Sequence, residues 1–334
     1  MTISNSMKVL IVNKQEIIDA ISMQECIDSM QETLILLEEG YATNPLRNSM
    51  MVSDKNGLLS MMPGYINKKN IMGIKSVSVY PENANNGLES HQGSVTLFNA
   101  KNGVPLAIMD AGQITAIRTA AVSAVATKIL ANKNSKILTI LGSGVQASTH
   151  IEAMNTILNL DEIRVWSRNK NNAKTFIEEQ SKKYDVPFQH FDSVNDSICD
   201  ADVICTTTAS VEPILYGKYL MDGVHINAVG SSVYNTRELD GTAMKLCKLY
   251  VDKKESTINE SGDFLIAKQE GAIDDNHIIG SLGEILINQI NGRKNHTDMT
   301  LFKSLGLAVE DIATAFFIYN KYENTGKGNW VKFG

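Results

Sequence analysis

The sequence has few cysteines, little arginine and no long apolar run, and each shortage excludes a class of protein. The four cysteines have neither the spacing of a metal site nor that of a disulfide framework; they are Cys26, Cys199, Cys205 and Cys247. No stretch reaches the ~18 consecutive apolar residues of a membrane span, and no long apolar leader opens the chain. We therefore expect a soluble cytoplasmic protein that binds no metal.

Basic character is low as well. The net charge is −6 and the isoelectric point is about 5.6, which argues against nucleic acid, because proteins that bind it present a basic face. A hydrophobic content of 43% over 334 residues is typical of a globular protein with roughly two domains of about 150 residues. Since arginine is scarce, each one is informative; the six are Arg47, Arg118, Arg164, Arg168, Arg237 and Arg293.

The first part of the chain predicts one helix and a series of strands. Apolar residues recur at helical spacing from Ser22 to Gly40, and Gly40 is a stop signal. Asn102-Gly103 is typical of a hairpin turn between strands. The strand-like runs are 8–13, Leu58–Met62, Ile71–Tyr80, Ser94–Phe98 and Pro105–Met109. Consecutive strands with short connections indicate an antiparallel or mixed sheet, and so an α+β domain.

After a helix predicted over Thr115–Ala131, strands alternate with helices, which indicates βαβ units and a parallel sheet. The expected elements are strands Ile137–Leu141, Glu162–Ser167, Val203–Thr207, Val224–Val229 and Leu249–Asp252, with helices over 145–158 and 170–184. A last amphipathic helix, Leu307–Tyr322, carries Ile312, Phe316 and Tyr319 on one stripe. We expect this helix to pack on the first domain.

The strongest local motif is Lys136–Ala147, which reads as a strand, a glycine-rich turn and the start of a helix. Gly142 and Gly144 allow close approach of a ligand to the backbone, and the helix start offers unpaired N–H groups to an anion. Gly-x-Gly-x-x-Ala is a weak pattern alone, but here a strand precedes it and a helix follows. The segment therefore predicts a dinucleotide site with the pyrophosphate on this turn.

The residues after the second strand of this unit indicate which dinucleotide binds. NAD-binding chains usually carry Asp or Glu there, which bonds the ribose 2′-hydroxyl and repels a 2′-phosphate. This chain has Ser167, Arg168 and Asn169, and a hydroxyl beside a cation suits a phosphate. We predict a preference for NADP(H), with NAD(H) as the second cofactor. The alternative is that Arg168 is a solvated loop residue.

Two cations fall on apolar faces. On a helix, Arg118 shares a stripe with Val122, and an inward guanidinium needs an anionic partner because burying an unpaired charge is costly. That partner is either an acidic residue of the fold or a ligand carboxylate or phosphate. By the period of two, Lys75 lies on the face of Val77, with the same two alternatives. Arg47 lies in a predicted loop.

Several segments together resemble the ornithine cyclodeaminase/mu-crystallin family, in the right order and over nearly the whole chain. They are Ser90–Gln92, Ala111–Ala121, Gly142–Ala147, Ile226–Gly230, Glu260–Asp263, Leu282–Glu284 and Phe302–Gly306. The resemblance implies an α/β homodimer whose chains combine two domains. Residues 116–304 are expected to form a Rossmann-type, doubly wound parallel sheet. Residues 1–115 and 305–334 are expected to form a discontinuous α+β domain for substrate binding and dimerisation.

The resemblance also implies roles for individual residues. Those at the places of Arg47, Lys75 and Arg118 hold a substrate carboxylate beside the nicotinamide, and Glu260 is a further candidate at the substrate end. The residues expected to contact the cofactor are His91, Arg118, Thr119, Gly142, Ser143, Gly144, Val145, Gln146, Ser167, Arg168, Asn169, Thr206, Thr207, Val229 and Gly230.

One departure within the family pattern indicates the reaction. Ornithine cyclodeaminases carry Asp where this chain has Ser232, as mu-crystallin-like members do. Cyclodeamination needs a carboxylate base to move protons, whereas reduction of a preformed cyclic imine requires less. We therefore expect reduction of a cyclic ketimine carboxylate, with Lys75 as a proton donor and Ser232 hydrogen-bonded to the imine nitrogen.

The expected substrate is Δ1-pyrroline-2-carboxylate, reduced to L-proline, with the six-membered Δ1-piperideine-2-carboxylate, reduced to L-pipecolate, as a second substrate. Three alternatives remain at this point: an ornithine cyclodeaminase, an alanine-type dehydrogenase and a non-catalytic NADP-dependent binding protein.

Overall fold

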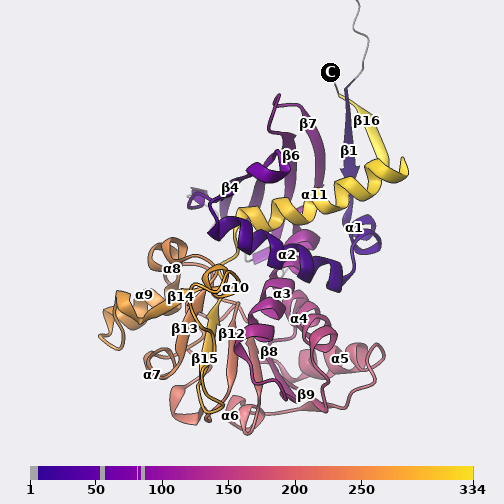
Figure 1. Ribbon diagram of the computed structural model, residues 1–334. Helices are drawn as coiled ribbons and strands as arrows, with labels where there is room; N and C mark the ends of the chain where they lie inside the picture. Colours follow the sequence, from indigo (N-terminus) through magenta and orange to yellow (C-terminus); the bar gives the residue numbers. More distant parts are fainter. Residues whose placement is uncertain (1–6, 53–56, 81, 84–86, 334) are drawn as a thin grey trace, which may run out of the picture. The chain divides into compact units, whose positions relative to one another are not determined.

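The computed structural model describes residues 7–52, 57–80, 82–83 and 87–333 (Figure 1). The chain divides into two compact units. The first consists of Met1–Arg118 and Leu307–Gly334, and the second of Thr119–Gly306, whereas the sequence placed the boundaries at 115/116 and 304/305. Helix α3 (Ala111–Leu130) runs through the first boundary. It begins four residues before the predicted start because the Asp110 carboxylate accepts a hydrogen bond from the Gln113 N–H (2.7 Å) and caps the first turn.

The first unit is a mixed sheet with helices, as the sequence predicted. Its strands lie in the order β16-β1-β7-β6-β5-β4-β2, with β3 paired to β4; β1 runs parallel to β7 and the other pairs are antiparallel. The elements are β1 (Lys8–Val12), α1 (Lys14–Ala20), α2 (Met23–Glu38), β2 (Ala42–Thr43), β3 (Asn48–Val52), β4 (Gly57–Ile66), a 3-10 turn (Asn67–Lys69), β5 (Ile71–Val79), β6 (His91–Asn99), β7 (Pro105–Asp110), α11 (Ala308–Thr325) and β16 (Asn329–Lys332).

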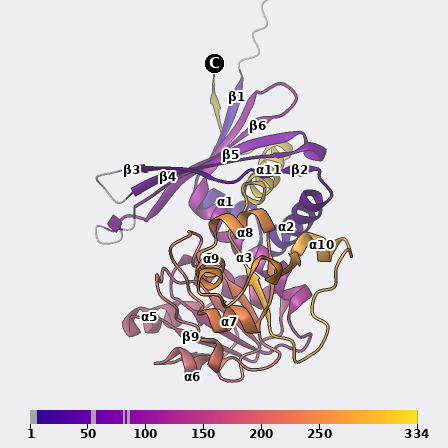
Figure 2. The same ribbon diagram turned by 90° about the vertical axis from the view of Figure 1, so that its left-hand side faces the viewer.

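Helix α11 covers one face of this sheet, where it crosses β4 to β7 and packs on α2 (Figures 1 and 2). Gly64 and Gly73 allow the close approach: a Cβ added to either would lie about 3 Å from Ile312 (2.9 Å from Cδ1 and 3.1 Å from Cγ1, respectively). Of the predicted stripe, Ile312 and Tyr319 are buried and Phe316 is half-buried. The last helix therefore returns to the first part of the chain.

The second unit contains a parallel sheet in the order β10-β9-β8-β11-β12-β15-β13-β14, in which every described pair is parallel. Its elements are β8 (Ile137–Leu141), α4 (Val145–Ile157), β9 (Glu162–Trp166), α5 (Lys170–Gln180), β10 (Phe188–His190), α6 (Val194–Ile198), β11 (Val203–Thr206), a 3-10 turn (Gly217–Tyr219), β12 (His225–Ala228), α7 (Gly241–Leu246), β13 (Lys248–Val251), α8 (Lys254–Glu260), α9 (Gly262–Gln269), a 3-10 turn (Asp275–His277), β14 (Ile278–Ser281), α10 (Leu282–Leu286) and β15 (Thr300–Lys303).

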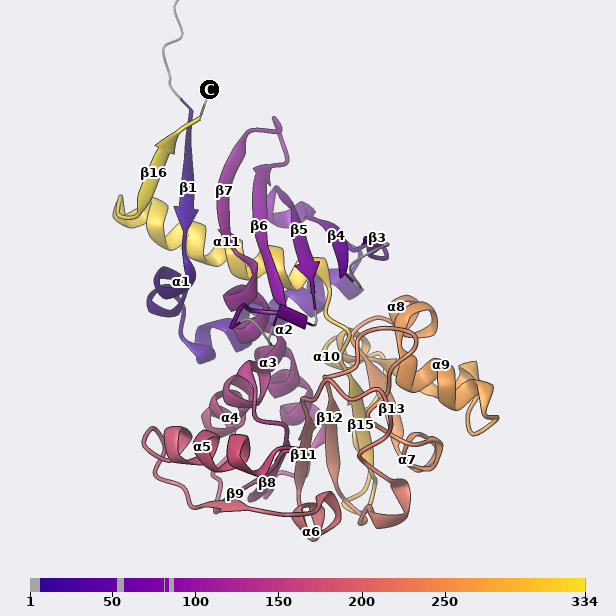
Figure 3. The same cartoon turned by 180° about the vertical axis from the view of Figure 1, so that it is seen from behind.

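The predicted Rossmann-type fold is confirmed. Helices α4 and α5 pack beside β8 and β9 (Figure 3), and the central strands are buried along their whole length, as expected for a sheet covered on both faces. This architecture places the turns after β8, β9, β11 and β12 at the carboxyl edge of the sheet, where doubly wound folds bind ligands.

Candidate active site

The glycine-rich turn after β8 has the backbone conformation that only glycine adopts without strain. Gly142 has φ = +136°, and its N–H donates to the Trp166 carbonyl oxygen (2.8 Å). A Cβ at this position would lie 2.5 Å from Thr207 Oγ1 and 2.9 Å from the Thr207 carbonyl oxygen. The turn is therefore packed against both neighbouring strands and is rigidly placed.

The start of α4 is open in the way an anion site requires. Gly144 is the N-cap residue, makes no side-chain capping bond, and has no atom within 4 Å of the position of an added Cβ. The next residue, Val145, is 59% exposed, while Gln146 is half-buried one residue further on. The first N–H groups of a helix lack intrahelical partners and carry the positive end of its dipole. Together these features fit a dinucleotide pyrophosphate.

The loop after β9 lies against this turn. Ser143 Oγ donates to Ser167 Oγ (3.0 Å), which joins the two predicted cofactor segments. Arg168 is exposed. The Asn169 side-chain oxygen accepts from the N–H groups of Asn171 (2.9 Å) and Asn172 (3.2 Å), so it caps α5. Ser167 and Arg168 thus remain the candidates for the adenosine ribose end.

The predicted cofactor residues after β11 and β12 are held by a carboxylate that the sequence did not indicate. The buried Thr206 hydroxyl donates to Glu238 Oε2 (2.6 Å), as does the Gly230 N–H (2.8 Å), while Thr208 donates to Oε1 through its N–H and its hydroxyl (both 2.7 Å). Val229 and Gly230 also donate to the Thr206 carbonyl oxygen. The Thr206 hydroxyl is therefore engaged within the protein. The Thr207 hydroxyl donates to the Leu141 carbonyl oxygen (3.1 Å).

Glu238 belongs to a buried charged cluster with Asp263 and Lys303, all three 0% exposed. Lys303 Nζ lies 2.8 Å from Asp263 Oδ2 and donates to the Ser231 carbonyl oxygen (2.6 Å). Asp263 Oδ1 accepts from the Glu238 N–H (2.8 Å). Burial raises the pKa of Glu238, against the opposing charge of Lys303. The cluster fixes the backbone after β12, just before Ser232, which is half-buried.

The first unit holds the predicted cations. Lys75 is 4% exposed, its Nζ lies 2.7 Å from Asp311 Oδ2, and it donates to the Thr115 hydroxyl (3.4 Å). Burial lowers the pKa of Lys75 to about 8; the charge of Asp311 opposes this shift, and those of Arg118 and Arg47 add to it. Lys75 therefore points inward, as the strand period predicted.

Arg118 has both acidic partners on one helix. Its Nε donates to Asp311 Oδ1 (2.9 Å) and its Nη1 to Glu310 Oε2 (2.9 Å). Burial alone would raise the pKa of Asp311, yet Arg118 and Lys75 together keep it below its usual value. The sequence left two partners open for Arg118, an acidic residue of the fold or a ligand anion, and the structure contains the acidic residues. That Arg118 also binds a ligand carboxylate stays a prediction.

The remaining predicted residues are placed as follows. Arg47 is half-buried in the segment before β3, and His91 begins β6 with its Nδ1 3.0 Å from Ser90 Oγ. Thr119 is buried on α3, and Glu260 is half-buried at the last position of α8. Among the described residues, no group of His, Cys, Asp and Glu could hold a metal ion.

The sequence pattern of the ornithine cyclodeaminase/mu-crystallin family matches residues 7–326. This chain belongs to that family. Rat ketimine reductase mu-crystallin is 41% identical over 286 residues, 86% of this chain and 87% of the rat protein. A Bacillus cereus Δ1-pyrroline-2-carboxylate reductase is 33% identical over 97% of this chain and 100% of its own.

Solved structures of relatives have the same fold as this chain. Thermococcus litoralis Δ1-pyrroline-2-carboxylate reductase, in complex with NADH and L-proline, superimposes with a TM-score of 0.94 at 40% identity, covering 97% of this chain and 100% of the other. An archaeal alanine dehydrogenase dimer with bound NAD gives 0.92 at 29% identity, covering 98% and 100%. In the part of the chain that the structure describes, no helix is long and apolar enough to cross a membrane.

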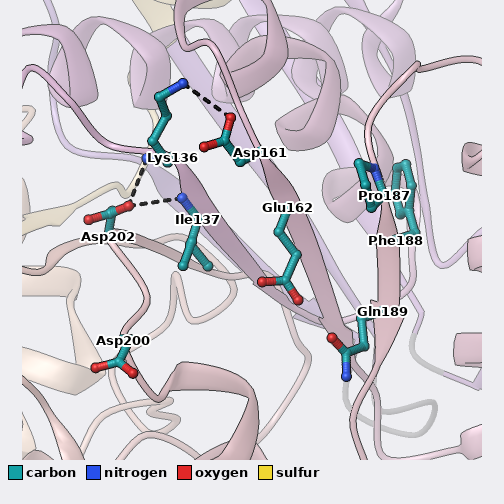
Figure 4. A pocket seen from close by; sticks show the side chains of 9 residues that line it. All are labelled: Lys136, Ile137, Asp161, Glu162, Pro187, Phe188, Gln189, Asp200 and Asp202. Carbon is teal, nitrogen blue, oxygen red and sulfur yellow. Dashed lines mark hydrogen bonds and ion pairs between the residues drawn. The ribbon is translucent and has the colours of Figure 1, made fainter.

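A pocket in the second unit lies away from these motifs (Figure 4). Ile137, Glu162 and Phe188 line it, and they are the first residues of β8, β9 and β10. Asp202 there accepts from the N–H groups of Lys136 (2.7 Å) and Ile137 (2.9 Å) and so holds the start of β8. The pocket is thus at the amino edge of the sheet, opposite the edge at which doubly wound folds bind nucleotides.

Proposed function

We propose that this chain is a nicotinamide-dependent ketimine reductase that converts Δ1-pyrroline-2-carboxylate to L-proline and also accepts the six-membered Δ1-piperideine-2-carboxylate. The observation that carries the proposal is the buried cation cluster of the first unit. There the buried Lys75 and Arg118 pair with the carboxylates of Glu310 and Asp311, and the positive charge of the half-buried Arg47 acts on Lys75. Cations gathered in this way suit a substrate carboxylate.

The relatives support the same chemistry. The rat relative is a ketimine reductase, the Bacillus cereus relative is a Δ1-pyrroline-2-carboxylate reductase, and the Thermococcus relative was solved with L-proline. In the reduction, the C=N double bond becomes a single bond, a hydride goes to carbon and a proton to nitrogen. A lysine with a pKa of about 8 is largely protonated near neutral pH, yet releases its proton more readily than an exposed lysine. We assign Lys75 as the proton donor.

We propose NADP(H) as the preferred cofactor and NAD(H) as the second. The bound nicotinamide supplies the hydride. In the second unit, the turn at Gly142–Gly144 and the open start of α4 would hold the pyrophosphate. Ser167 and the exposed Arg168 would hold the ribose 2′-phosphate. The backbone at Val229 and Gly230, which Glu238 fixes, is assigned to the nicotinamide end.

We propose that two chains form a homodimer through the open face of the first unit's sheet. This face, opposite α11, carries a partly exposed apolar surface of Pro63, Tyr65, Met72, Ile74 and Phe98. The archaeal alanine dehydrogenase relative is a dimer. Light scattering is expected to give twice the chain mass of 36.6 kDa; the mass of a single chain would contradict the proposal.

The function is tested by a substrate panel on the purified protein. Each cyclic imine is added with NADPH or NADH, and oxidation of the reduced nicotinamide is followed by absorbance. We expect oxidation with both imines, faster with NADPH, and a large loss in Lys75→Met. No oxidation with either imine would contradict the proposal. Ammonia release from L-ornithine would instead indicate a cyclodeaminase, NADH production from L-alanine a dehydrogenase, and ligand binding without turnover a binding protein.

A further inference from the structure

We propose that Asp311 is a positioning residue of the reaction, which fixes the orientation of Lys75 and Arg118 and keeps Lys75 in its ammonium form. The inference rests on the proposed function, because it takes Lys75 as the group that binds and protonates the imine. Asp311 lies in the first turn of α11, a segment for which the sequence predicted only a packing role.

The Asp311 carboxylate joins side chains from two other elements. Oδ2 lies 2.7 Å from Lys75 Nζ on β5. Oδ1 accepts from Arg118 Nε (2.9 Å) and from the Thr115 hydroxyl (3.4 Å), both on α3. Asp311 is 0% exposed, so these contacts account for the burial of its charge. One carboxylate thus sets the distance between the two cations and the direction of each.

The surroundings of Lys75 explain why this contact decides its charge. Among the described residues, the charged and titratable groups that act on Lys75 include Arg47 before β3, His91 on β6, Arg118 on α3 and Asp311 on α11. Burial and the two arginines favour the neutral amine, and Asp311 favours the ammonium. Glu310, the neighbouring acid, pairs with Arg118. Asp311 is therefore the acidic group that directly opposes deprotonation of Lys75.

The test compares pH profiles of kcat/KM for reduction of one cyclic imine. In the wild type, kcat/KM should fall on the alkaline side of the profile as Lys75 loses its proton, and the midpoint of this alkaline limb is expected at the lysine pKa of about 8. Asp311→Asn keeps the shape but removes the charge, so the pKa of Lys75 falls and its proton is lost at lower pH. Removal of an opposite charge in contact is expected to move the limb down by about 1–2 pH units. At pH 8, the protonated fraction of Lys75, and kcat/KM with it, then falls by about 5- to 50-fold.

Matched variants separate charge from packing. Thr115→Val removes the hydroxyl that contacts both Lys75 and Asp311 but no charge, and should leave the limb where it is. Because the same imine is used throughout, its own ionisation contributes equally to every profile. The proposal would be overturned if the alkaline limb of the Asp311→Asn profile lay at the wild-type pH. It would also be overturned if Thr115→Val moved the limb down by as much as Asp311→Asn does.

A further variant covers failure of Asp311→Asn to fold, which thermal melting detects. Asp311→Glu retains the charge but displaces it by one methylene group, so kcat should fall while the alkaline limb of the pH profile stays at the wild-type pH. A wild-type kcat in Asp311→Glu would overturn the positioning role. If the wild type reduced no cyclic imine, the proposed function would fail. Asp311 is then tested by an NMR titration of Lys75, in which an unchanged midpoint in Asp311→Asn would overturn the inference.

Discussion

The predicted cofactor preference depends on one exposed side chain, Arg168. It is the second residue after β9, next to Ser167, whose hydroxyl contacts the glycine-rich turn (3.0 Å). The neighbouring Asn169 caps α5 and so has its side-chain oxygen engaged. If Arg168 holds the 2′-phosphate of NADPH, Arg168→Ala removes that contact and leaves the turn intact.

The size of the effect follows from the exposure of the site. A hydrogen bond to a charged group contributes about 1.5–3 kcal/mol, and an exposed arginine belongs at the lower end of this range. Since about 1.4 kcal/mol corresponds to a tenfold change, KM for NADPH should rise roughly 10-fold in Arg168→Ala. NADH has no 2′-phosphate, so KM for NADH should change less than about twofold, as expected for a surface substitution that removes no contact.

The assay is steady-state imine reduction with each cofactor. Lys170→Ala is a matched control, because Lys170 is also an exposed cation at the start of α5, but it is paired with Asp192 (2.8 Å). The control should alter the NADPH/NADH ratio less than Arg168→Ala does. An unchanged ratio in Arg168→Ala would refute the reasoning and leave Arg168 as a solvated loop residue.

Three further predictions concern the second unit. Gly142→Ala should destabilise the protein by about 1–3 kcal/mol, because Gly142 has a positive φ and a new Cβ would contact Thr207. Gly144→Ala places its Cβ in open space, so this variant should keep the wild-type melting temperature but bind NADPH more weakly. An unchanged affinity for NADPH would argue against the pyrophosphate site. Lys303→Met leaves Asp263 buried without its cation and should lower the free energy of unfolding by about 3–5 kcal/mol, measured by denaturant titration; a loss below about 1 kcal/mol would contradict this account.

The order of elements was predictable from the sequence because it depends on local patterns. The apolar run at Ile137–Leu141 and the glycines after it indicated a strand and a turn, and the structure has both. Several short strands were missed, including β15, which is buried between β12 and β13, and the edge strands β2 and β16. β2 has two residues and β16 is mostly exposed, so neither shows the periodicity of a half-buried strand; each is defined by pairing with a partner that sequence patterns do not identify.

The ligand-facing residues were predictable only in part. The stripe of Arg118 showed that the guanidinium needs an anion, but its partners lie 192 and 193 residues further along the chain, beyond any local pattern. Asp263 and Lys303 fall within segments that resemble the family, yet their pairing is tertiary. Glu238 carried no sequence signal, since an isolated Glu is typical of a solvated surface.

The most direct test of the central claim is the stoichiometry of one reaction. Purified protein is incubated with Δ1-pyrroline-2-carboxylate and NADPH, and L-proline and oxidised cofactor are quantified together. The account predicts equal amounts of the two products, with formation of both greatly reduced in Lys75→Met. Absence of L-proline, or cofactor oxidation without it, would contradict the assignment of this chain as a ketimine reductase.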